Sequence, residues 1–386
     1  MKTWTFVKPI YGHSHFLHLL SFIFLFSCGI ATGIFVTSYI KTVSFNLNVT
    51  QFSFSAEESP LPEPNNHTAV QMPRVGLNEY LKVPESVKHD MNDEELRWRA
   101  SMAPNVDKFP FDRVPKVAFM FLTRGPVLMA PLWERFFKGH QGFYSIYVHS
   151  NPSYNESDPE TPVFHGRRIP SKEVGWGKVN MIEAERRLLG NALLDLSNQR
   201  FVLLSETCIP LFNFSTIYSY LINSTTSFVE SYDLEGGVGR GRYSPRMSPE
   251  ISINQWRKGS QWFEMDRQLA LQVVSDTKYF SIFRRYCKGS CYSDEHYLPT
   301  FVSMKHSEKN SNRTLTWVDW SRGGPHPTRY VRSEVTAELL VSLRSKSNCL
   351  YNGNSNSTCF LFARKFLPTA LYRLLTFAPK VMHFNI

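Results

Sequence analysis

Three short, unbroken apolar runs, separated by stretches with helical character, constrain the fold of this chain more than any other feature. The runs VAFMFL, FYSIYVH and RFVLLS occupy residues 117–122, 143–149 and 200–205. Such runs are typical of strands that are buried on both faces. Residues 127–138 and 178–196 lie between them and have helical character. In the second stretch the apolar residues share one side. The alternation predicts an α/β fold with a mixed, mostly parallel sheet flanked by helices.

An apolar segment near the N-terminus predicts a membrane anchor. No Asp, Glu, Lys or Arg occurs between Lys8 and Lys41, and the 21 residues 16–36 are densely apolar. At ~1.5 Å per residue they extend roughly 31 Å, about the hydrocarbon thickness of a bilayer. The cations that precede the segment favour a cytosolic tail over residues 1–15 and an uncleaved transmembrane helix over residues 16–40. A cleaved signal peptide is the alternative, for which 31–33 is a poor cleavage site.

The positions of the glycosylation sequons agree with this orientation. All of them follow the apolar segment: Asn48, Asn66, Asn155, Asn213, Asn223, Asn312 and Asn356. Because Asn-x-Ser/Thr is modified on the lumenal side of the secretory pathway, these positions favour a lumenal body. We expect a single-pass type II protein of the Golgi membrane, with a plasma-membrane ectodomain as the alternative.

The lumenal part divides into a stem and a catalytic domain. Residues 41–113 are polar, carry spaced prolines and show little periodicity, which is typical of a stem. One short helix is expected around residues 92–102, with an acidic first turn and with one side packed on the body. Residues 114–386 are predicted to form the globular domain.

Charge and cysteine content narrow the chemistry. Lys and Arg number 43 against 33 Asp and Glu, a net charge of +10 that suits an anionic ligand. No nucleic-acid motif accompanies it, so nucleic-acid binding is not expected. Six cysteines are too few for a disulfide scaffold and too scattered for a zinc module. Cys287–Cys291 and Cys349–Cys359 are short-loop pairing possibilities that leave Cys208 over, although sequence does not fix the connectivity.

The densest cluster of ionisable groups is CYSDEHY, residues 291–297. Asp294 and Glu295 could provide a general base with a raised pKa. The structural alternative is a helix start with Ser293 as N-cap and both carboxylates in the first turn. The glycine-rich stretch EGGVGRGR at 235–242 is interpreted as a mobile loop beside the site, not as a dinucleotide site. An aromatic turn at 317–327 could stack on sugar rings.

Several segments together resemble one known family. They are FYSIYVHSNP, EVGWGKVNMIEAERRLL, FVLLSETCIPL, SFVESYDLEGGVGRGRYSPRM, QWRKGSQWFEMDRQLA, CYSDEHYLPT, WVDWSRGGPHPTRY and CFLFARKF. In this order, over residues 114–370, they resemble the plant-type branch of the core-2/I-branching β-1,6-N-acetylglucosaminyltransferases, glycosyltransferase family 14. The resemblance implies a GT-A-like fold and an inverting nucleotide-sugar transferase that needs no divalent metal. Residues 114–386 contain no Asp-x-Asp motif, but Asp233 and Glu235 keep a metal-dependent alternative open.

The resemblance also implies roles for single residues. Glu295 falls on the family's catalytic base, which takes the proton from the acceptor hydroxyl. Lys365, in LFARKF, falls on the lysine that binds the diphosphate. The family has a second basic diphosphate ligand upstream, for which Arg344 or Lys346 are the candidates here.

Further positions of the resemblance concern the two substrates. His149 lies where animal members usually carry an acidic residue next to the uridine. Trp176 and Gly177 match a loop near the nucleotide. Glu230 matches an acceptor-binding glutamate, and Trp320 matches an aromatic residue that stacks on a sugar.

These features predict a Golgi transferase that moves a sugar of the GlcNAc or GlcA type from a UDP-sugar. The expected acceptor is a glycan on a secreted glycoprotein or a wall polysaccharide. No cofactor or metal is expected, and the chain would contact the membrane through its N-terminal helix. It could assemble with itself or with other Golgi enzymes. A catalytically silent, membrane-anchored glycan-binding or scaffold protein is the alternative from another functional class.

Overall fold

A computed structural model describes residues 21–30, 86–104, 108–154, 161–345 and 347–384 of the chain. The chain divides into two compact units, residues 1–73 and 74–386. In the first unit, residues 21–30 form a helix whose side chains are exposed. None of the helices within the described ranges is both long and apolar enough to cross a membrane. Most of the predicted anchor at 16–40 lies outside those ranges, and so does residue 346.

A four-stranded sheet forms the centre of the second unit, with the strand order β2-β1-β3-β5. β1 (Lys116–Leu122) pairs in parallel with both β2 (Tyr144–His149) and β3 (Asn198–Ser205). The short β5 (Glu264–Asp266) runs antiparallel to β3. The mixed, mostly parallel sheet predicted from the three apolar runs is therefore confirmed.

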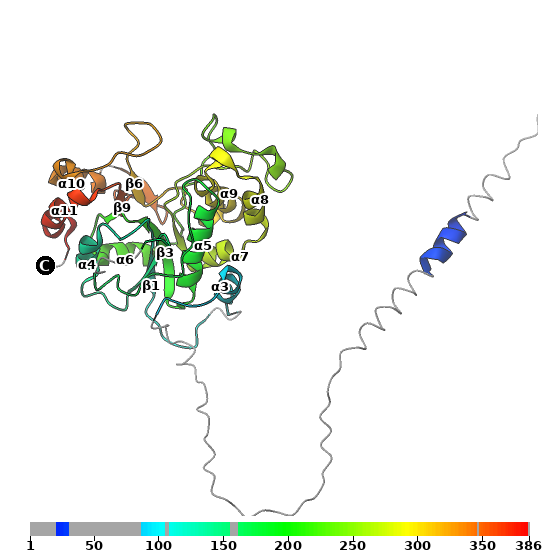
Figure 1. Ribbon diagram of the computed structural model, residues 1–386, viewed down its shortest axis with the longest axis horizontal. Helices are drawn as coiled ribbons and strands as arrows, with labels where there is room; N and C mark the ends of the chain where they lie inside the picture. Colours follow the sequence, from blue (N-terminus) through cyan, green and yellow to red (C-terminus); the bar gives the residue numbers. More distant parts are fainter. Residues whose placement is uncertain (1–20, 31–85, 105–107, 155–160, 346, 385–386) are drawn as a thin grey trace, which may run out of the picture. The chain divides into compact units, whose positions relative to one another are not determined.

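Helices cover both faces of this sheet (Figure 1). The hydrophobic cluster on one face includes residues of α4 (Ala130–Phe137), α6 (Phe214–Ile222), α10 (Ala337–Ser345) and α11 (Leu371–Phe377). The cluster on the other face includes residues of α5 (Asn180–Leu193), α7 (Arg267–Ser275), α8 (Lys278–Tyr286) and α9 (Tyr297–Lys305). Side chains of β1 alternate between the two layers, because Phe119 and Phe121 join the first cluster and Ala118 and Met120 the second. The unbroken apolar run of β1 follows from this double burial.

A second, smaller sheet brings the C-terminal part of the chain to the end of β3. Its order is β4 (Ile209–Pro210), β9 (Phe362–Arg364) and β6 (Thr316–Val318). The Phe366 amide donates to the Thr207 carbonyl at 3.1 Å, so Lys365 lies beside the turn that follows β3. A hairpin of β7 (Cys349–Tyr351) and β8 (Asn354–Asn356) precedes β9.

Short 3-10 and π turns complete the described elements. They are η1 Arg240–Arg242, η2 Pro245–Met247, η3 Gly289–Cys291, η4 Ser293–Glu295, η5 Ser307–Lys309, η6 Arg332–Glu334, η7 Pro368–Ala370 and η8 Ala378–Met382. Disulfides join Cys287 to Cys291 and Cys349 to Cys359, while Cys208 is a buried free thiol. Both short-loop pairings considered from the sequence are thus confirmed.

Helix α3 (Asp93–Ala100) lies within the segment predicted as a stem, and it packs on the body. Asn92 caps it, with Glu95 completing a capping box. Leu96 is buried against Gly190 of α5, where a Cβ would lie 3.1 Å from the leucine Cγ. The Asp93 carboxylate accepts from the Arg187 Nε at 2.7 Å. The boundaries of tail, anchor, stem and catalytic domain stay predictions.

Four sequons lie in described residues, and glycosylation at all seven stays a prediction. Asn213 is the N-cap of α6 and Asn223 its C-cap, Asn312 has a positive φ of 52°, and Asn356 ends β8. Asn48, Asn66 and Asn155 lie outside the described residues.

Candidate active site

Glu295 lies in η4, just before α9, where two cations hold one of its carboxylate oxygens. The Arg242 Nη1 donates to Oε2 at 2.6 Å, and the Lys258 Nζ donates to the same oxygen at 2.8 Å. Both charged bonds end on Oε2, so Oε1 is the oxygen left to accept a proton from a substrate. The site therefore holds a carboxylate in a fixed orientation with one oxygen engaged.

The two adjacent carboxyl groups of this cluster have opposite pKa shifts. Burial alone would raise the pKa of Glu295, but the charges and hydrogen bonds of Lys258 and Arg242 outweigh it and lower the pKa. Burial and the neighbouring charge of Glu295 raise the pKa of Asp294 to about 6. The raised pKa expected in this cluster thus falls on Asp294, and Glu295 is ionised at neutral pH.

The interpretation of Ser293 as a helix N-cap is wrong. The residue that precedes η4 is Tyr292, and His296 precedes α9, with no side-chain capping bond at either position. The Ser293 hydroxyl is buried and has no hydrogen-bond partner among the described residues. Asp294 and Glu295 are therefore not the first turn of a long helix but a tight turn leading into α9.

Glu230, the predicted acceptor residue, lies next to the predicted base. Burial raises its pKa, the charge of Lys258 opposes this shift, and the charge of Glu295 adds to it. The backbones run close together, since a Cβ on Gly259 would lie 1.8 Å from the Glu230 carbonyl oxygen. The Gly259 amide also donates to the Glu295 carbonyl at 2.9 Å. The charge of Lys258 thus acts on two carboxylates that come from distant segments.

An aromatic wall adjoins the base. The Trp176 ring lies 5.1 Å from the Tyr292 ring and 5.5 Å from the His326 ring, measured between centroids. Gly177 has a φ of +69°, and a Cβ there would lie 2.7 Å from the Tyr292 Cδ1. Trp176 is 52% exposed, so this wall can contact a ligand. The loop of Trp176 and Gly177 therefore lies beside Glu295.

The aromatic turn containing Trp320 meets this wall through His326. Trp320 is 51% exposed, and its carbonyl accepts from the Gly323 amide at 2.9 Å. The Asp319 carboxylate fixes the turn by accepting from the Ser321 amide and from the Tyr330 hydroxyl. The turn thus presents an exposed indole ring, as stacking on a sugar requires.

Lys365 lies in a cluster of cations. Burial and the charge of Arg364 lower its pKa, Glu206 opposes that shift, and Arg329 and Arg124 add to it. Arg124 follows β1 and Glu206 follows β3, so the cluster lies beyond the carboxyl ends of parallel strands. Nucleotides bind at this edge in open α/β sheets. The cluster therefore suits a diphosphate.

Arg124 and Arg329 were not predicted from the sequence, where Arg344 or Lys346 were the candidates for the second basic ligand; Lys346 lies outside the described residues. The Arg344 Nη1 donates to the Val381 carbonyl, and its guanidinium lies 4.4 Å above the Phe212 ring. Arg344 therefore joins the C-terminal segment to Phe212, which precedes α6. It is not among the cations whose charges lower the pKa of Lys365. The position of Arg124, directly after a buried strand, was the available signal.

His149 ends β2 and is 1% exposed. Burial, and then the charge of Arg187, lower its pKa to about 3, so the ring is neutral. Its Nε2 accepts from the Lys172 amide at 3.3 Å. His149 thus supports the loop that leads to Trp176 instead of presenting its ring to the site.

Of the two carboxylates considered for a metal, Asp233 is paired with an arginine. The Arg240 Nε donates to Asp233 at 2.8 Å, and this guanidinium lowers the pKa of Asp233. Over the described part of the chain, no three His, Cys, Asp or Glu side chains gather as metal ligands would. The glycine-rich loop at 235–242 does lie beside the site, because its Arg242 reaches Glu295.

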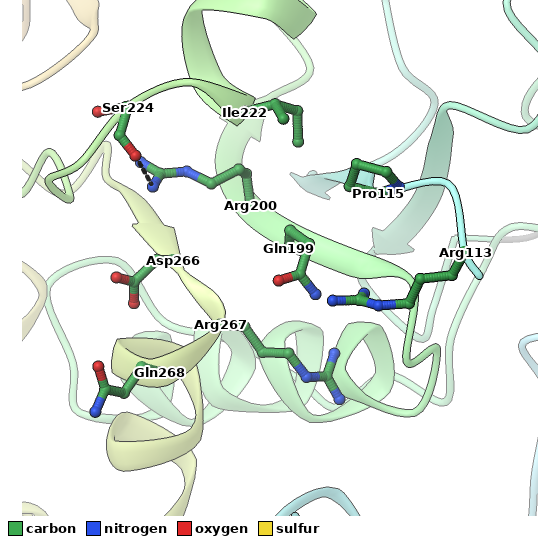
Figure 2. A pocket seen from close by; sticks show the side chains of 9 residues that line it. All are labelled: Arg113, Pro115, Gln199, Arg200, Ile222, Ser224, Asp266, Arg267 and Gln268. Carbon is green, nitrogen blue, oxygen red and sulfur yellow. Dashed lines mark hydrogen bonds between the residues drawn. The ribbon is translucent and has the colours of Figure 1, made fainter. Parts of the chain in front are cut away.

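A separate groove of about 590 Å³ lies at the opposite end of β3 (Figure 2). Its arginines already have partners: Arg200 bonds to Glu264, Arg113 to the Leu196 carbonyl, and Arg267 to the Leu193, Asp195 and Asn198 carbonyls. Arg200 thereby joins β3 to β5, while Arg113 and Arg267 hold the segment that connects α5 to β3. The groove is thus lined by structural contacts and is not part of the active site.

The chain is similar to a known protein family and to a curated plant protein. The family model described as Core-2/I-Branching enzyme matches residues 117–344. A curated protein of Oryza sativa subsp. japonica, named Glycosyltransferase BC10, is 35% identical over 306 residues, which cover 67% of this chain and 76% of the rice protein. The matched range includes Glu230, Lys258 and Glu295 and ends before Lys365.

Proposed function

Because the chain belongs to the Core-2/I-Branching enzyme family and is a glycosyltransferase, we propose that it transfers a sugar from a UDP-sugar with inversion and without a divalent metal. The sugar is of the GlcNAc or GlcA type. The acceptor is a hydroxyl of a glycan on a secreted glycoprotein or a wall polysaccharide. Glu295 is the general base.

The observation that carries this proposal is the orientation of Glu295. Its Oε2 is bonded to Arg242 and Lys258, which keep the group ionised and leave Oε1 for the acceptor. In the reaction, the acceptor hydroxyl gives its proton to Oε1 while its oxygen attacks the anomeric carbon from the face opposite UDP. The bond from that carbon to the UDP oxygen breaks, and UDP leaves with the electron pair. A base in this position typically supplies ~10²–10⁴-fold in rate.

The cation cluster around Lys365 supports departure of UDP without a metal. Lys365, Arg329 and Arg124 can meet the negative charge that develops on the diphosphate, because fixed charges act strongly in a partly buried site. The Asp233 carboxylate is paired with Arg240, which further supports the metal-independent reaction over one that uses Asp233 and Glu235.

Placement in the Golgi membrane is part of the same proposal. The apolar segment at 16–36 and the seven sequons that follow it support a type II protein with a lumenal catalytic domain. A nucleotide-sugar transferase of secreted glycans requires this orientation, since its acceptor is lumenal.

The test is UDP release by the full-length protein in detergent. UDP-GlcNAc, UDP-GlcA, UDP-Gal and UDP-Xyl are each offered with a pooled wall-glycan acceptor, with and without EDTA. We expect release that depends on acceptor, resists EDTA and is abolished by Glu295→Gln. The matched control is Glu250→Gln, which removes an exposed carboxylate elsewhere and leaves the rate unchanged.

Other outcomes would contradict separate parts of the proposal. Release that EDTA stops and Asp233→Asn abolishes would replace it with the metal-dependent reaction. A folded protein that binds UDP, releases none with any donor and still binds glycan would support the glycan-binding or scaffold function. Full activity of Glu295→Gln would overturn the assignment of the base.

A further inference from the structure

Tyr292 has a backbone conformation that is rare for a large side chain. Its φ is +49° and its ψ is +68°, in the left-handed region. It lies between the Cys287–Cys291 disulfide and η4, and its carbonyl accepts from the Glu295 amide at 3.0 Å. Such conformations persist where surrounding contacts enforce them, often next to functional groups. The contacts of its ring indicate what this conformation achieves.

Two segments converge on the Tyr292 ring, the glycine-rich loop through Arg242 and the loop of Trp176 and Gly177. The Arg242 Cζ lies 4.2 Å above the ring centroid, and the same guanidinium donates to Glu295 at 2.6 Å. The Trp176 ring meets it edge-on at 5.1 Å. Gly177 closes against its edge, where no Cβ could be accommodated without movement. The guanidinium is therefore held between an aromatic face and the carboxylate that it binds.

We propose that Tyr292 is a positioning residue for the reaction: its ring holds Arg242 on Glu295 Oε2 and so keeps Oε1 directed at the acceptor. This inference rests on the proposed role of Glu295 as the base. In this role, Tyr292 contacts neither the reacting atoms nor the diphosphate cluster. It acts on the base through the Arg242 guanidinium.

The physical reason is the freedom of a long side chain. An arginine loses much rotamer entropy when it is fixed, and a face-on aromatic ring offsets part of that loss by a cation–π contact. Without the ring, Arg242 would sample positions off Oε2, and the carboxylate would rotate more freely. The charged and titratable groups that face Glu295 are Arg242, Lys258, Asp294, Glu230, Tyr232 and His296. Among them, Arg242 lies over the Tyr292 ring.

Three substitutions at Tyr292 separate the ring from the hydroxyl and from the backbone. Tyr292→Phe keeps the ring and should retain the wild-type kcat within about two-fold. Tyr292→Leu and Tyr292→Asn both remove the ring, and asparagine tolerates the left-handed conformation better than leucine. Each should lower kcat roughly 5- to 30-fold, as loss of a partly buried cation–π contact would. The KM for the UDP-sugar should change less than kcat, because the diphosphate cluster is untouched and only one ring contact of the Trp176 loop is lost.

The pH profile provides a readout that a purely structural role would not move. Arg242 lowers the pKa of Glu295, so a loosened Arg242 lets that pKa rise. The acidic limb of kcat/KM should therefore move to higher pH in Tyr292→Leu and Tyr292→Asn, and Tyr292→Phe should restore it. Tyr372→Leu is the matched control, because Tyr372 also carries an arginine over its ring, Arg332 at 5.1 Å, on an exposed surface.

Gly177 gives an independent test through a double-mutant cycle. Gly177→Ala places a Cβ 2.7 Å from the Tyr292 Cδ1 and should displace the ring, in addition to straining the backbone at φ +69°. In the Tyr292→Asn background this ring is absent, so Gly177→Ala should lower kcat less than it does in the wild type. Additive effects of the two substitutions on kcat would contradict the proposal.

The outcomes separate this inference from the proposed function. If Glu295→Gln is inactive while folded Tyr292→Leu and Tyr292→Asn keep wild-type kcat and pH profile, Tyr292 has no positioning role and the base assignment stands. A loss in Tyr292→Phe equal to that in Tyr292→Leu would also overturn the inference, because the hydroxyl would then be the active part. If Glu295→Gln is fully active, the base assignment fails whatever Tyr292 does.

Discussion

Removal of the Lys258 charge should raise the pKa of Glu295 and so reduce the activity of this enzyme at acidic pH. The Lys258 Nζ lies 2.8 Å from the Glu295 Oε2, and the two side chains are 15% and 27% exposed. At this distance the attraction between unit charges is about 6 kcal/mol at an effective dielectric of ~20 and about 1.5 kcal/mol in bulk water. At ~1.4 kcal/mol per pKa unit, this range corresponds to roughly one to four units. Because Arg242 stays on the same oxygen, we expect a rise near the lower end, about one to two units.

The assay is the pH dependence of kcat/KM, measured by UDP release for wild type, Lys258→Met and Lys258→Arg. The base must be ionised, so activity falls as pH drops through the pKa of Glu295. That pKa is lowered in the wild type, and loss of a neighbouring cation raises it. The acidic limb of Lys258→Met should therefore move to higher pH by about one to two units, while Lys258→Arg should keep the wild-type limb. A limb that stays in place or moves to lower pH in Lys258→Met would refute the reasoning.

The same shift has a consequence for stability. A carboxyl group whose folded pKa is lowered contributes stability above its unfolded pKa, and this contribution is lost as pH falls through the folded pKa. The difference in unfolding free energy between wild type and Lys258→Met should therefore be largest near neutral pH and should shrink on acidification. Urea unfolding at several pH values measures it.

Two further predictions concern the diphosphate cluster and the backbone beside the base. Lys365→Met and Arg329→Gln should each weaken UDP binding about 10- to 100-fold, as measured by calorimetry. Arg344→Gln should lower the unfolding free energy and leave UDP affinity unchanged. Loss of UDP affinity in Arg344→Gln, with affinity kept in the other two variants, would restore Arg344 as the ligand. Gly259→Ala should lower the unfolding free energy, measured in urea, by about 3 kcal/mol or more, because the new Cβ would lie 1.8 Å from the Glu230 carbonyl oxygen. Gly237→Ala is the control and should leave the unfolding free energy nearly unchanged, because no atom lies within 4 Å of its Cβ.

The sequence predicted the large elements of the fold and missed the short strands. β1, β2 and β3 are buried on both faces, so their apolar runs identified them to within two residues. β5 spans three residues, two of them acidic, and carries no periodic signal. Glu264 is acceptable in that buried strand because it forms a bidentate pair with Arg200 on β3, 64 residues away. A contact of that kind cannot be anticipated from local pattern.

The candidate site shows the same division between local and distant information. The carboxylate cluster at 294–295 is local and was found, but Lys258 and Arg242 lie 37 and 53 residues from Glu295 along the chain. Arg344 and Lys346 were the candidates because the family resemblance implies a second basic ligand upstream of Lys365. Besides its neighbour Arg364, the cations whose charges reach Lys365 are Arg329 and Arg124. Arg124 follows β1, and Arg329 precedes Tyr330, which bridges to Phe366 just after β9.

Asp294 and Glu295 show why the identity of a residue does not decide its chemistry. The two carboxyl groups are neighbours in one turn, yet the pKa of Asp294 is raised and that of Glu295 is lowered. Asp294 is 7% exposed, and its Oδ1 has no hydrogen-bond partner among the described residues. Glu295 has two cations on one oxygen. Two titratable groups whose environments shift their pKa values in opposite directions commonly have different roles. Glu295 therefore suits a base that stays ionised, and Asp294 does not. The assignment therefore follows from Arg242 and Lys258 as much as from Glu295 itself.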